Sequence, residues 1–266
     1  MITSVGNARI KRVIALKEKA KLRRDENVFV IEGVRMFQEA PESHINELYL
    51  TEEFERTSDE MTREKIKQCR QNQRTVVEIV TRQVFDKISA TVTPQGILGI
   101  VDQPQYNMED LLKTATPMLL IVENIQDPGN LGTIFRTAEG AGVDGIIMSK
   151  ETVDLYNPKT IRSTMGSIYR VPYLITEDLK EGILNLKNKG IEVFAAHLSG
   201  NDIYDGISFR GACAFLIGNE GNGLSDEIAA LASTKIKIPM QGQVESLNAA
   251  IAAALLMYEA RRQRGL

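Results

Sequence analysis

Three blocks of glycine and polar residues occupy the C-terminal part of the chain, and each follows a short apolar run. The blocks span residues 124–136, 216–225 and 238–248, and the apolar runs span 118–122, 212–217 and 235–238. A continuous apolar run of this length is typical of a parallel strand that is covered on both faces. Loops that leave the carboxyl ends of parallel strands meet at one edge of the sheet, where ligands bind. The three blocks therefore predict an α/β fold with one composite site.

Two glycine motifs of nucleotide-binding proteins do not match these blocks. A phosphate-binding P-loop has a lysine directly after its second glycine. Gly218 and Gly223 have the right spacing, but Leu224 stands at the lysine position. A dinucleotide fingerprint reads G-x-G-x-x-G early in a βαβ unit, whereas this chain has G-x-x-G-x-G late in its sequence. A nucleotide-dependent oxidoreductase is therefore only a distant alternative.

In their order and spacing, the three blocks resemble motifs 1, 2 and 3 of the SpoU (TrmH-type) RNA 2′-O-ribose methyltransferases of the SPOUT superfamily. The resemblance covers residues 117–262, and residues 29–40 resemble the N-terminal substrate-binding domain of ribosomal-RNA members. It implies a small α/β (L30e-like) domain followed by an α/β-knot domain with a parallel sheet and a deep trefoil knot. It also implies S-adenosyl-L-methionine as cofactor, RNA as substrate and a homodimer.

A break in the pattern predicts where the two domains meet. Residues 1–104 alternate helix and strand signals, and Pro104 then interrupts any ladder. We therefore expect an RNA substrate-binding domain over 1–104, a linker over 105–116 and a methyltransferase domain over 117–266. A helix over 8–21, a helix with Ser58 as its N-cap, and a last helix beginning near Ser246 are among the expected elements. Residues 249–257 are apolar almost all round, which predicts burial on every side against the sheet and a partner subunit.

The resemblance assigns roles residue by residue. It implies cofactor binding by Gly218, Ile238 and Leu247, and catalysis by Asn130, Arg136, Glu220, Ser246 and Asn248. At Gly218 a side chain would obstruct close approach of the backbone to the ligand. An alternative for Asn130 and for Ser246 is that each caps a helix, because both residue types are preferred there.

Arg136 is the essential arginine of the first block in the resemblance, sometimes described as the base that takes the 2′-hydroxyl proton. Arginine stays protonated in proteins, so we expect a different role. Its planar cationic fork is suited to holding a phosphate and stabilising a developing alkoxide. The proton would then pass to water or to a neighbouring polar group.

The distribution of charge shows a basic stripe near the start of the chain. The net charge of −3 argues against indiscriminate nucleic-acid binding, yet a run of cations faces a single acid, Glu18, between residues 9 and 24. The stripe is either an RNA contact or a solvated helix face, and its members are Arg9, Lys11, Arg12, Lys17, Lys19, Lys21, Arg23 and Arg24.

The rest of the composition points to a cytoplasmic protein. No apolar run reaches the roughly 18 residues of a membrane span, and no apolar segment of a signal peptide follows Met1. Of the two cysteines, Cys69 and Cys213, Cys213 lies in an apolar run and is expected to be a buried reduced thiol, and no cysteine, histidine and acidic residues have the spacing of a metal site. His197 could line the edge of the site, although a structural role is the more ordinary reading of a histidine.

The leading hypothesis is an RNA ribose 2′-O-methyltransferase that acts on ribosomal RNA. One alternative is transfer RNA as substrate, against which the N-terminal domain argues, since tRNA-specific relatives commonly lack it. The other is a catalytically silent RNA-binding protein on the same fold, which would not need all the motif residues together.

Overall fold

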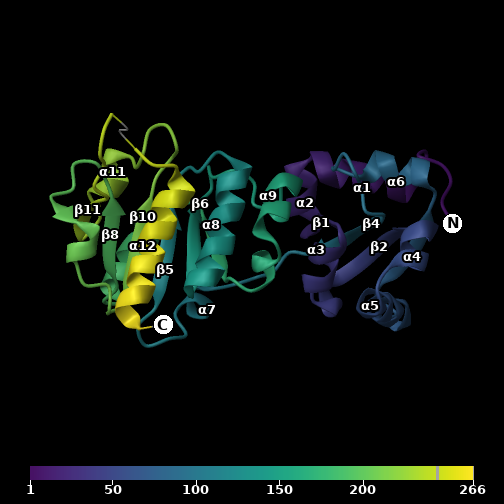
Figure 1. Ribbon diagram of the computed structural model, residues 1–266, viewed down its shortest axis with the longest axis horizontal. Helices are drawn as coiled ribbons and strands as arrows, with labels where there is room; N and C mark the ends of the chain where they lie inside the picture. Colours follow the sequence, from purple (N-terminus) through teal and green to yellow (C-terminus); the bar gives the residue numbers. More distant parts are fainter. Residues whose placement is uncertain (244–245, 266) are drawn as a thin grey trace. The chain divides into compact units, whose positions relative to one another are not determined.

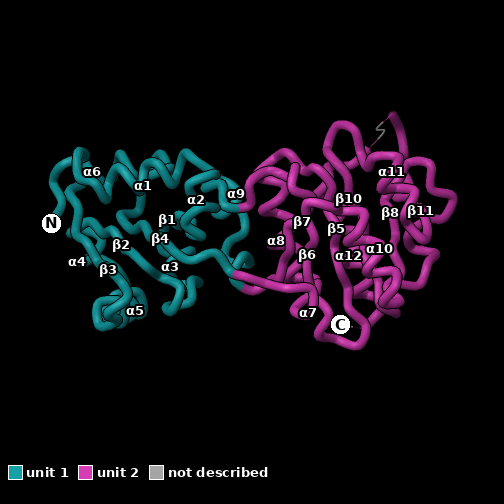
Figure 2. The backbone as a smooth tube through the Cα atoms, turned by 180° about the vertical axis from the view of Figure 1, so that it is seen from behind, with its two compact units in different colours: residues 1–104, 156–169 teal, residues 105–155, 170–266 magenta. Residues whose placement is uncertain are grey.

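Two units make up the chain in the computed structural model, which describes residues 1–243 and 246–265 (Figures 1 and 2). The first unit comprises residues 1–104 and 156–169, and the second comprises residues 105–155 and 170–266. The N-terminal stretch of the first unit ends at Pro104, the last residue of the predicted first domain. The unit, however, takes in residues 156–169, which the prediction left in the second domain.

A four-stranded sheet in the order β1-β4-β2-β3 forms the centre of the first unit. β4 is antiparallel to both of its neighbours, and β2 is parallel to β3. Helices α1 and α6 cover one face with a core of aliphatic side chains, Tyr49 and Phe85, and α3 and α5 pack on the sheet as well. The strands are β1 (Val28–Glu32), β2 (Ile45–Thr51), β3 (Val76–Val80) and β4 (Ile97–Asp102). The helices are α1 (Ala8–Glu18), α2 (Ala20–Glu26), α3 (Val34–Glu39), α4 (Glu52–Thr57), α5 (Glu60–Gln71), α6 (Arg82–Ile88) and α9 (Pro158–Thr164).

Two helix predictions for this unit are wrong in detail. The single helix expected over 8–21 is broken at Lys19, because Arg23 folds back and donates to the carbonyls of Leu16 and Lys17. These are carbonyls that a helix leaves without an internal partner at its end. The N-cap of α5 is Asp59, which accepts from the Thr62 amide at 2.8 Å, and Ser58 instead ends α4.

Residues 156–169 complete the core of the first unit from a distant part of the sequence. Phe29 of β1 is fully buried, and its ring lies 5.0 Å from the ring of Tyr156 and 6.2 Å from that of Tyr169, measured between centroids. Helix α9 packs on the same strand. A buried phenylalanine must be covered on all sides, and here the covering aromatic rings follow it by more than a hundred positions.

The second unit contains a seven-stranded sheet in the order β7-β6-β5-β10-β8-β11-β9, with every paired strand parallel. This confirms the predicted parallel α/β architecture; the trefoil knot stays a prediction. The strands are β5 (Met118–Val122), β6 (Gly145–Ser149), β7 (Tyr173–Thr176), β8 (Glu192–Ala196), β9 (Asp202–Ile203), β10 (Cys213–Ile217) and β11 (Thr234–Lys237). The helices are α7 (Met108–Leu111), α8 (Pro128–Ala141), α10 (Leu179–Asn188), α11 (Asp226–Ala229) and α12 (Ala249–Arg264).

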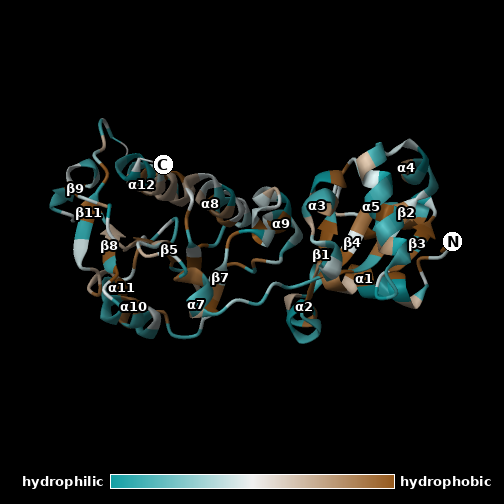
Figure 3. Cartoon of the chain, turned by 90° about the horizontal axis from the view of Figure 1, so that it is seen from below, coloured by the Kyte–Doolittle hydropathy of each residue, from teal (hydrophilic) through white to brown (hydrophobic). Residues whose placement is uncertain are grey.

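Helices cover both faces of this sheet, which explains why its central strands are apolar throughout. Figure 3 shows α8 and α12 on one face and α7, α10 and α11 on the other. Leu111, Ile183 and Ile228 bring the second group of helices into one core with the sheet. The layers place the loops that follow β5, β10 and β11 at the carboxyl edge, where the three sequence blocks lie.

Helix α12 differs from its prediction in start and in burial. It begins at Ala249, with Asn248 as the N-cap, rather than near Ser246. One face is buried, but Ile251 is 50% exposed, Leu255 36% and Tyr258 48%. Burial on every side is therefore not reached within one chain.

Candidate functional site

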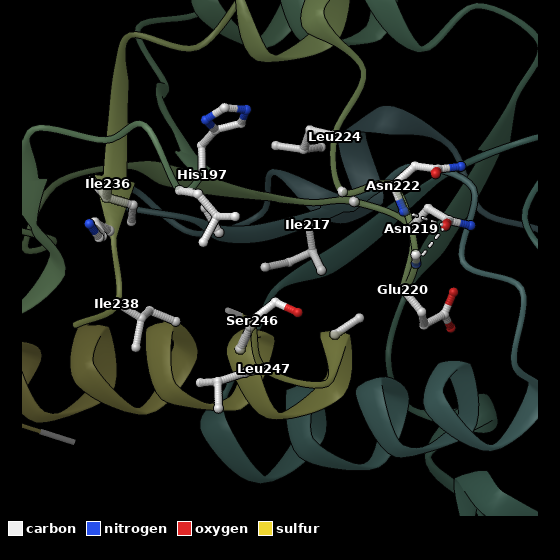
Figure 4. A pocket seen from close by; sticks show the side chains of 18 of the residues that line it. His197, Ile217, Asn219, Glu220, Asn222, Leu224, Ile236, Ile238, Ser246 and Leu247 are labelled. Carbon is white, nitrogen blue, oxygen red and sulfur yellow. Dashed lines mark hydrogen bonds between the residues drawn. The ribbon is translucent and has the colours of Figure 1, made fainter. Parts of the chain in front are cut away.

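A cavity of about 290 Å³ opens between the second and third blocks (Figure 4). The loop after β10 supplies the glycine-rich wall from Gly218 to Gly223. Apolar side chains of β10, β11 and the segments that follow the glycine loop, follow β11 and precede α12 supply much of the rest: Ile217, Leu224, Ile236, Ile238 and Leu247. Of the predicted site residues, Gly218, Glu220, Ile238, Ser246 and Leu247 line this cavity. Val244 and Glu245 of the third block lie outside the described residues.

Glu220 joins the second block to the first. One carboxylate oxygen accepts from the Asn130 side-chain amide at 2.9 Å and from the Asp127 backbone amide at 3.1 Å. The other oxygen accepts from the Gln126 backbone amide at 3.0 Å. Partial burial acts to raise the pKa of Glu220, but these hydrogen bonds outweigh it and hold the pKa below its ordinary value. The carboxylate is therefore ionised at neutral pH and fixes the loop before α8.

Asn130 joins Glu220 to the third block. Its side-chain oxygen accepts from the Asn248 side-chain amide at 2.9 Å. The Asn248 oxygen is already used, because it accepts from the backbone amide of Ala250 as the N-cap of α12. A carboxylate can only accept, so the orientation of both asparagines follows from their partners. One hydrogen-bonded chain thus links all three blocks.

Neither Asn130 nor Ser246 is the N-cap of its helix, which was the alternative role that the sequence left open for both. The N-cap of α8 is Asp127, whose carboxylate accepts from the Asn130 backbone amide at 2.9 Å, with Pro128 in the first turn. Asn130 therefore lies inside the helix and its side chain is available to Glu220. Ser246 does not cap α12 and lies on the cavity wall.

The structure shows a reason for glycine at position 218 in addition to the close ligand approach that the sequence suggested. A side-chain carbon at Gly218 would overlap the backbone of Gly223 and Leu224. The loop closes tightly there, since Asn219 and Gly223 exchange two backbone hydrogen bonds of 3.0 and 2.9 Å. The glycine therefore permits the loop to fold back on itself, and this fold forms one wall of the cavity.

Arg136 is placed apart from the other predicted residues. It lies on the exposed side of α8 and does not line the cavity. Six residues turn a helix by about 600°, so Arg136 and Asn130 point from different sides of α8. Within the described residues, no hydrogen bond or ion pair is seen to its guanidinium group.

Two residues that support the site, Glu123 and Asn219, were not predicted. The buried carboxylate of Glu123 accepts from the Ser225 amide at 2.8 Å and from its hydroxyl at 2.6 Å, which ties the end of the glycine loop to β5. Asn219 donates to the Asn124 carbonyl at 2.8 Å. Both residues lie inside the conspicuous blocks or directly beside them, but only the fold shows that they face each other.

His197 lines the cavity, on the loop that follows β8. Its Nδ1 atom lies 2.8 Å from the Ser199 hydroxyl and accepts from the Ser199 amide at 3.2 Å. From the sequence, a position of His197 at the edge of the site was possible, but a purely structural role was favoured. The structure places the ring at the edge of the cavity, opposite Ser246 and Leu247 (Figure 4).

The basic stripe of the first unit divides into structural and exposed cations. Arg12 bonds to Glu26 and Glu47, and Arg23 is 3% exposed. Lys17 donates to the carbonyls of Lys87 and Ser89. The exposed members are Arg9, which pairs with Glu78, Lys21, which pairs with Asp25, and Lys11, Lys19 and Arg24.

Over the described part of the chain, no group of three histidine, cysteine or acidic side chains could hold a metal ion. Likewise, no described helix is long and apolar enough to cross a membrane. Cys69 and Cys213 are buried free thiols, and burial raises the pKa of each to about 11.

Comparison with known proteins identifies the family. Residues 117–258 match the model of the SpoU rRNA Methylase family. The chain belongs to this family. This match confirms the resemblance to the SpoU methylases that the three blocks indicated. Residues 7–99 match a second model, the MRM3-like substrate binding domain.

Individual SpoU relatives match along their whole length. The chain is 34% identical over 262 residues to "23S rRNA (guanosine(2553)-2'-O)-methyltransferase RlmP" of Bacillus subtilis, with 98% of each chain covered. An AdoMet-bound rRNA methyltransferase from Sinorhizobium meliloti has a TM-score of 0.87 at 30% identity, with 98% of this chain and 97% of that one covered. The AviRb methyltransferase from Streptomyces viridochromogenes, in complex with AdoMet, has a TM-score of 0.85 at 26% identity, with 97% and 99% covered.

Proposed function

We propose that this SpoU methylase transfers a methyl group from S-adenosylmethionine to a ribose 2′-hydroxyl of ribosomal RNA. The observation that carries the proposal is the hydrogen-bonded chain from Glu220 through Asn130 to Asn248 beside the glycine-walled cavity. A silent RNA-binding protein on this fold would have no use for such an arrangement. The full-length similarity to methyltransferases named for ribosomal RNA supports the choice of substrate.

The cavity fits an adenosine-containing cofactor. Ile217, Ile236 and Leu247 offer an apolar wall for a flat base, and the loop from Gly218 to Gly223 brings backbone groups close to it. Gly218, Ile238 and Leu247 are the proposed cofactor-binding residues. S-adenosylmethionine supplies the reactive methyl group when it is bound.

The hydrogen-bonded chain positions groups at the mouth of the cavity. Ionised Glu220 orients Asn130, and Asn130 fixes the start of α12 through Asn248, so hydrogen bonds hold the three loops together. Methyl transfer requires the ribose hydroxyl to lie in line with the bond that breaks, and such alignment is a large part of catalysis. We propose that Asn130, Glu220, Ser246 and Asn248 hold this geometry, and that water or a neighbouring polar group takes the proton.

Arg136 would act as a permanent cation that holds the RNA phosphate and stabilises the developing alkoxide. Because it stands apart from the cavity of its own chain, we propose that the site is completed in a homodimer. The exposed apolar face of α12 begins at Ile251, between Ala249 and Ala252, which line the cavity. A partner that covers this face therefore reaches the mouth of the cavity.

The same face includes part of α8. A side-chain carbon at Gly140 would lie 3.0 Å from the Tyr258 hydroxyl, so these two positions of α8 and α12 are adjacent. Arg136 precedes Gly140 by about one helical turn. A second copy packed on Leu255 and Tyr258 would thus also approach Arg136, and we propose that Arg136 serves the partner's cavity.

The first unit is the proposed RNA-binding part, because a substrate-binding model matches it and Lys11, Lys19 and Arg24 are exposed there. Such cations attract a phosphate backbone. An enzyme that modifies ribosomal RNA works where ribosomes are made, and we therefore propose a cytoplasmic location.

The proposal is tested by supplying S-adenosylmethionine with a labelled methyl group to the purified protein and each of two RNAs. Ribosomal RNA from cells without the protein should gain one ribose methyl group at a single mapped position. Transfer of the label to transfer RNA instead would favour the tRNA alternative. No transfer to either RNA by a protein that binds ribosomal RNA would favour the silent RNA-binding alternative.

A further inference from the structure

Helix α8 carries one basic and one acidic side chain, and they stand three positions apart. Between Pro128 and Ala141 the basic residue is Arg136 and the acidic residue is Glu139. Side chains at this spacing are neighbours on the surface of a helix, and opposite charges there attract each other. Arg136 therefore has a carboxylate nearby that could hold its guanidinium group.

Opposite charges at such spacings pair on other helices of this protein. On α6, Arg82 pairs with Asp86 four positions later. On α12, Arg262 pairs with Glu259 three positions before it. Within the part of the chain that the structure describes, the two charges of α8 are not paired with each other. The carboxylate of this helix has a different partner.

That partner is Arg170, which occupies both oxygens of Glu139. The Nε atom of Arg170 donates to one carboxylate oxygen, and its Nη2 atom donates to the other at 3.1 Å. A planar fork on two oxygens is the arrangement in which arginine and carboxylate bind each other best. The charge of Glu139 is thereby neutralised without the help of Arg136.

The packing of α8 against β7 brings Arg170 to this position. The ring of Phe135 on α8 meets the ring of Tyr173, the first residue of β7, edge-on with 5.6 Å between the centroids. Glu139 follows Phe135 by about one helical turn, and Arg170 precedes Tyr173 by three positions. One aromatic contact thus places the two charged groups beside each other.

Stability alone does not explain this ion pair. The side chain of Arg170 is 39% exposed and that of Glu139 is 36% exposed. Ion pairs in contact with water contribute little to the free energy of unfolding. The position of the pair, one helical turn from Arg136, points to an effect on that arginine.

We propose that Arg170 neutralises Glu139 so that Arg136 stays available for the anionic RNA. The inference rests on the proposed function, in which Arg136 holds a phosphate and stabilises the developing alkoxide. An unpaired Glu139 would compete for the guanidinium group of Arg136, and its charge would repel the phosphate. Arg170 is therefore a positioning residue, which acts on Arg136 through Glu139.

Arg170→Gln tests this, because it removes the cation and leaves Glu139 unpaired. We expect kcat/KM for ribosomal RNA to fall about threefold to fivefold, as for one uncompensated charge at the distance of a helical neighbour in water. Adding Glu139→Gln to this variant should restore the rate, since the competing carboxylate is then gone. A merely structural ion pair predicts no recovery, because the double variant lacks the pair as well. Tm should stay near the wild-type value in both variants.

Phenylglyoxal, which modifies guanidinium groups, gives a second readout that does not depend on methyl transfer. The rate at which it labels Arg136, measured without RNA by mass spectrometry of the peptide, should fall about twofold in Arg170→Gln, as for one helical ion pair. The rate should return to the wild-type value in the double variant. Lys180→Gln is the matched control, because it breaks another exposed ion pair of the same unit, with Glu227, and it should change neither readout.

The two readouts separate this inference from the proposed function. A double variant as slow as Arg170→Gln, or unchanged labelling of Arg136 in Arg170→Gln, would overturn the role of Arg170 while the proposed function stands. A wild-type protein that methylates no RNA would refute the proposed function instead. The labelling of Arg136 would still test whether Arg170 keeps that guanidinium group available.

Discussion

The side-chain amide of Asn248 lies 2.9 Å from the side-chain oxygen of Asn130, although 118 positions separate them in the sequence. The Asn130 amide in turn donates to Glu220. The direction of donation is the same at each step and ends on a group that can only accept. A substitution that replaces a donating amide of this chain with an acceptor should therefore change how the loops are placed beside the cavity.

Asn130→Asp replaces the amide that donates to Glu220 with an oxygen that can only accept. It places a second carboxylate against Glu220 and removes the donation at 2.9 Å. Because like charges at this distance repel, the loops should separate slightly, and misplacement by about 1 Å costs on the order of 10²-fold in rate. Methyl transfer measured at saturating substrates should fall by this amount.

Asn248→Asp is a matched variant for the same relationship. It keeps the oxygen that caps α12, and it replaces the amide that donates to Asn130 with a charged oxygen that can only accept. We expect a loss of methyl transfer with Tm near the wild-type value. A variant with full activity would show that the link between the first and third blocks is dispensable.

Arg136→Lys tests the role of the arginine. A cation that grips phosphate and alkoxide through two hydrogen bonds should lose about 10²–10³ in rate when its fork is removed, and Arg136→Ala should be slower still. Cofactor binding should remain, because the proposed partners of Arg136 are the RNA phosphate and the alkoxide and not the cofactor. A general base predicts the opposite, since lysine gives up a proton more readily than arginine. Activity of Arg136→Lys that overtakes the wild-type protein as pH rises would contradict the clamp.

Gly218→Ala should disrupt the glycine loop. The added carbon would overlap the backbone of Gly223 and Leu224, which cannot yield as a side chain can. Overpacking of this kind typically costs about 1–3 kcal/mol, and S-adenosylmethionine affinity measured by calorimetry should fall strongly. Gly206→Ala is the control, because a carbon there meets nothing within 4 Å. Unaltered affinity in Gly218→Ala would exclude the loop as part of the cofactor site.

The exposed cations of the basic stripe should differ from the structural ones. Replacing Lys11, Lys19 and Arg24 with Gln should weaken RNA binding and flatten its dependence on salt, because fewer counterions are released. Arg12→Gln should lower Tm instead, because it removes the ion pairs of Arg12 with Glu26 and Glu47. If the triple variant binds RNA with the wild-type salt slope, the stripe is only a solvated face.

The proposed homodimer predicts a change of mass in solution. Leu255→Glu together with Tyr258→Glu should shift the protein towards monomer in sedimentation analysis, because charges would replace the apolar face of α12. Leu184→Glu is the matched control, since Leu184 is 47% exposed on α10. A wild-type protein that sediments as a monomer would rule the dimer out.

Mixing two inactive variants tests whether Arg136 acts across that dimer. Arg136→Ala and Asn248→Asp protomers each lack one part of the site. Mixed dimers should recover activity at one of their two sites if Arg136 serves its partner. No recovery in mixed dimers would place Arg136 in the site of its own chain.

The sequence alone determined the parallel sheet of the second unit and the family. Apolar runs such as Met118–Val122 and polar blocks directly after them are local patterns, and β5 has the predicted bounds. Local patterns were less informative where a helix end depends on a distant partner. Lys19 breaks a helix because Arg23 takes the free carbonyls, and Asp127 rather than Asn130 caps α8.

Tertiary structure alone decided which residues meet. Phe29 is covered by Tyr156 and Tyr169 from the second half of the sequence, and Glu32 holds a loop nearly sixty positions away. The blocks predicted that Asn130, Glu220 and Asn248 share a site, but not who donates to whom, nor that Arg136 stands apart. The physical reason is that periodicity and spacing record the face of an element on which a residue lies. Hydrogen-bond partners depend on how the elements pack, to within a fraction of an ångström.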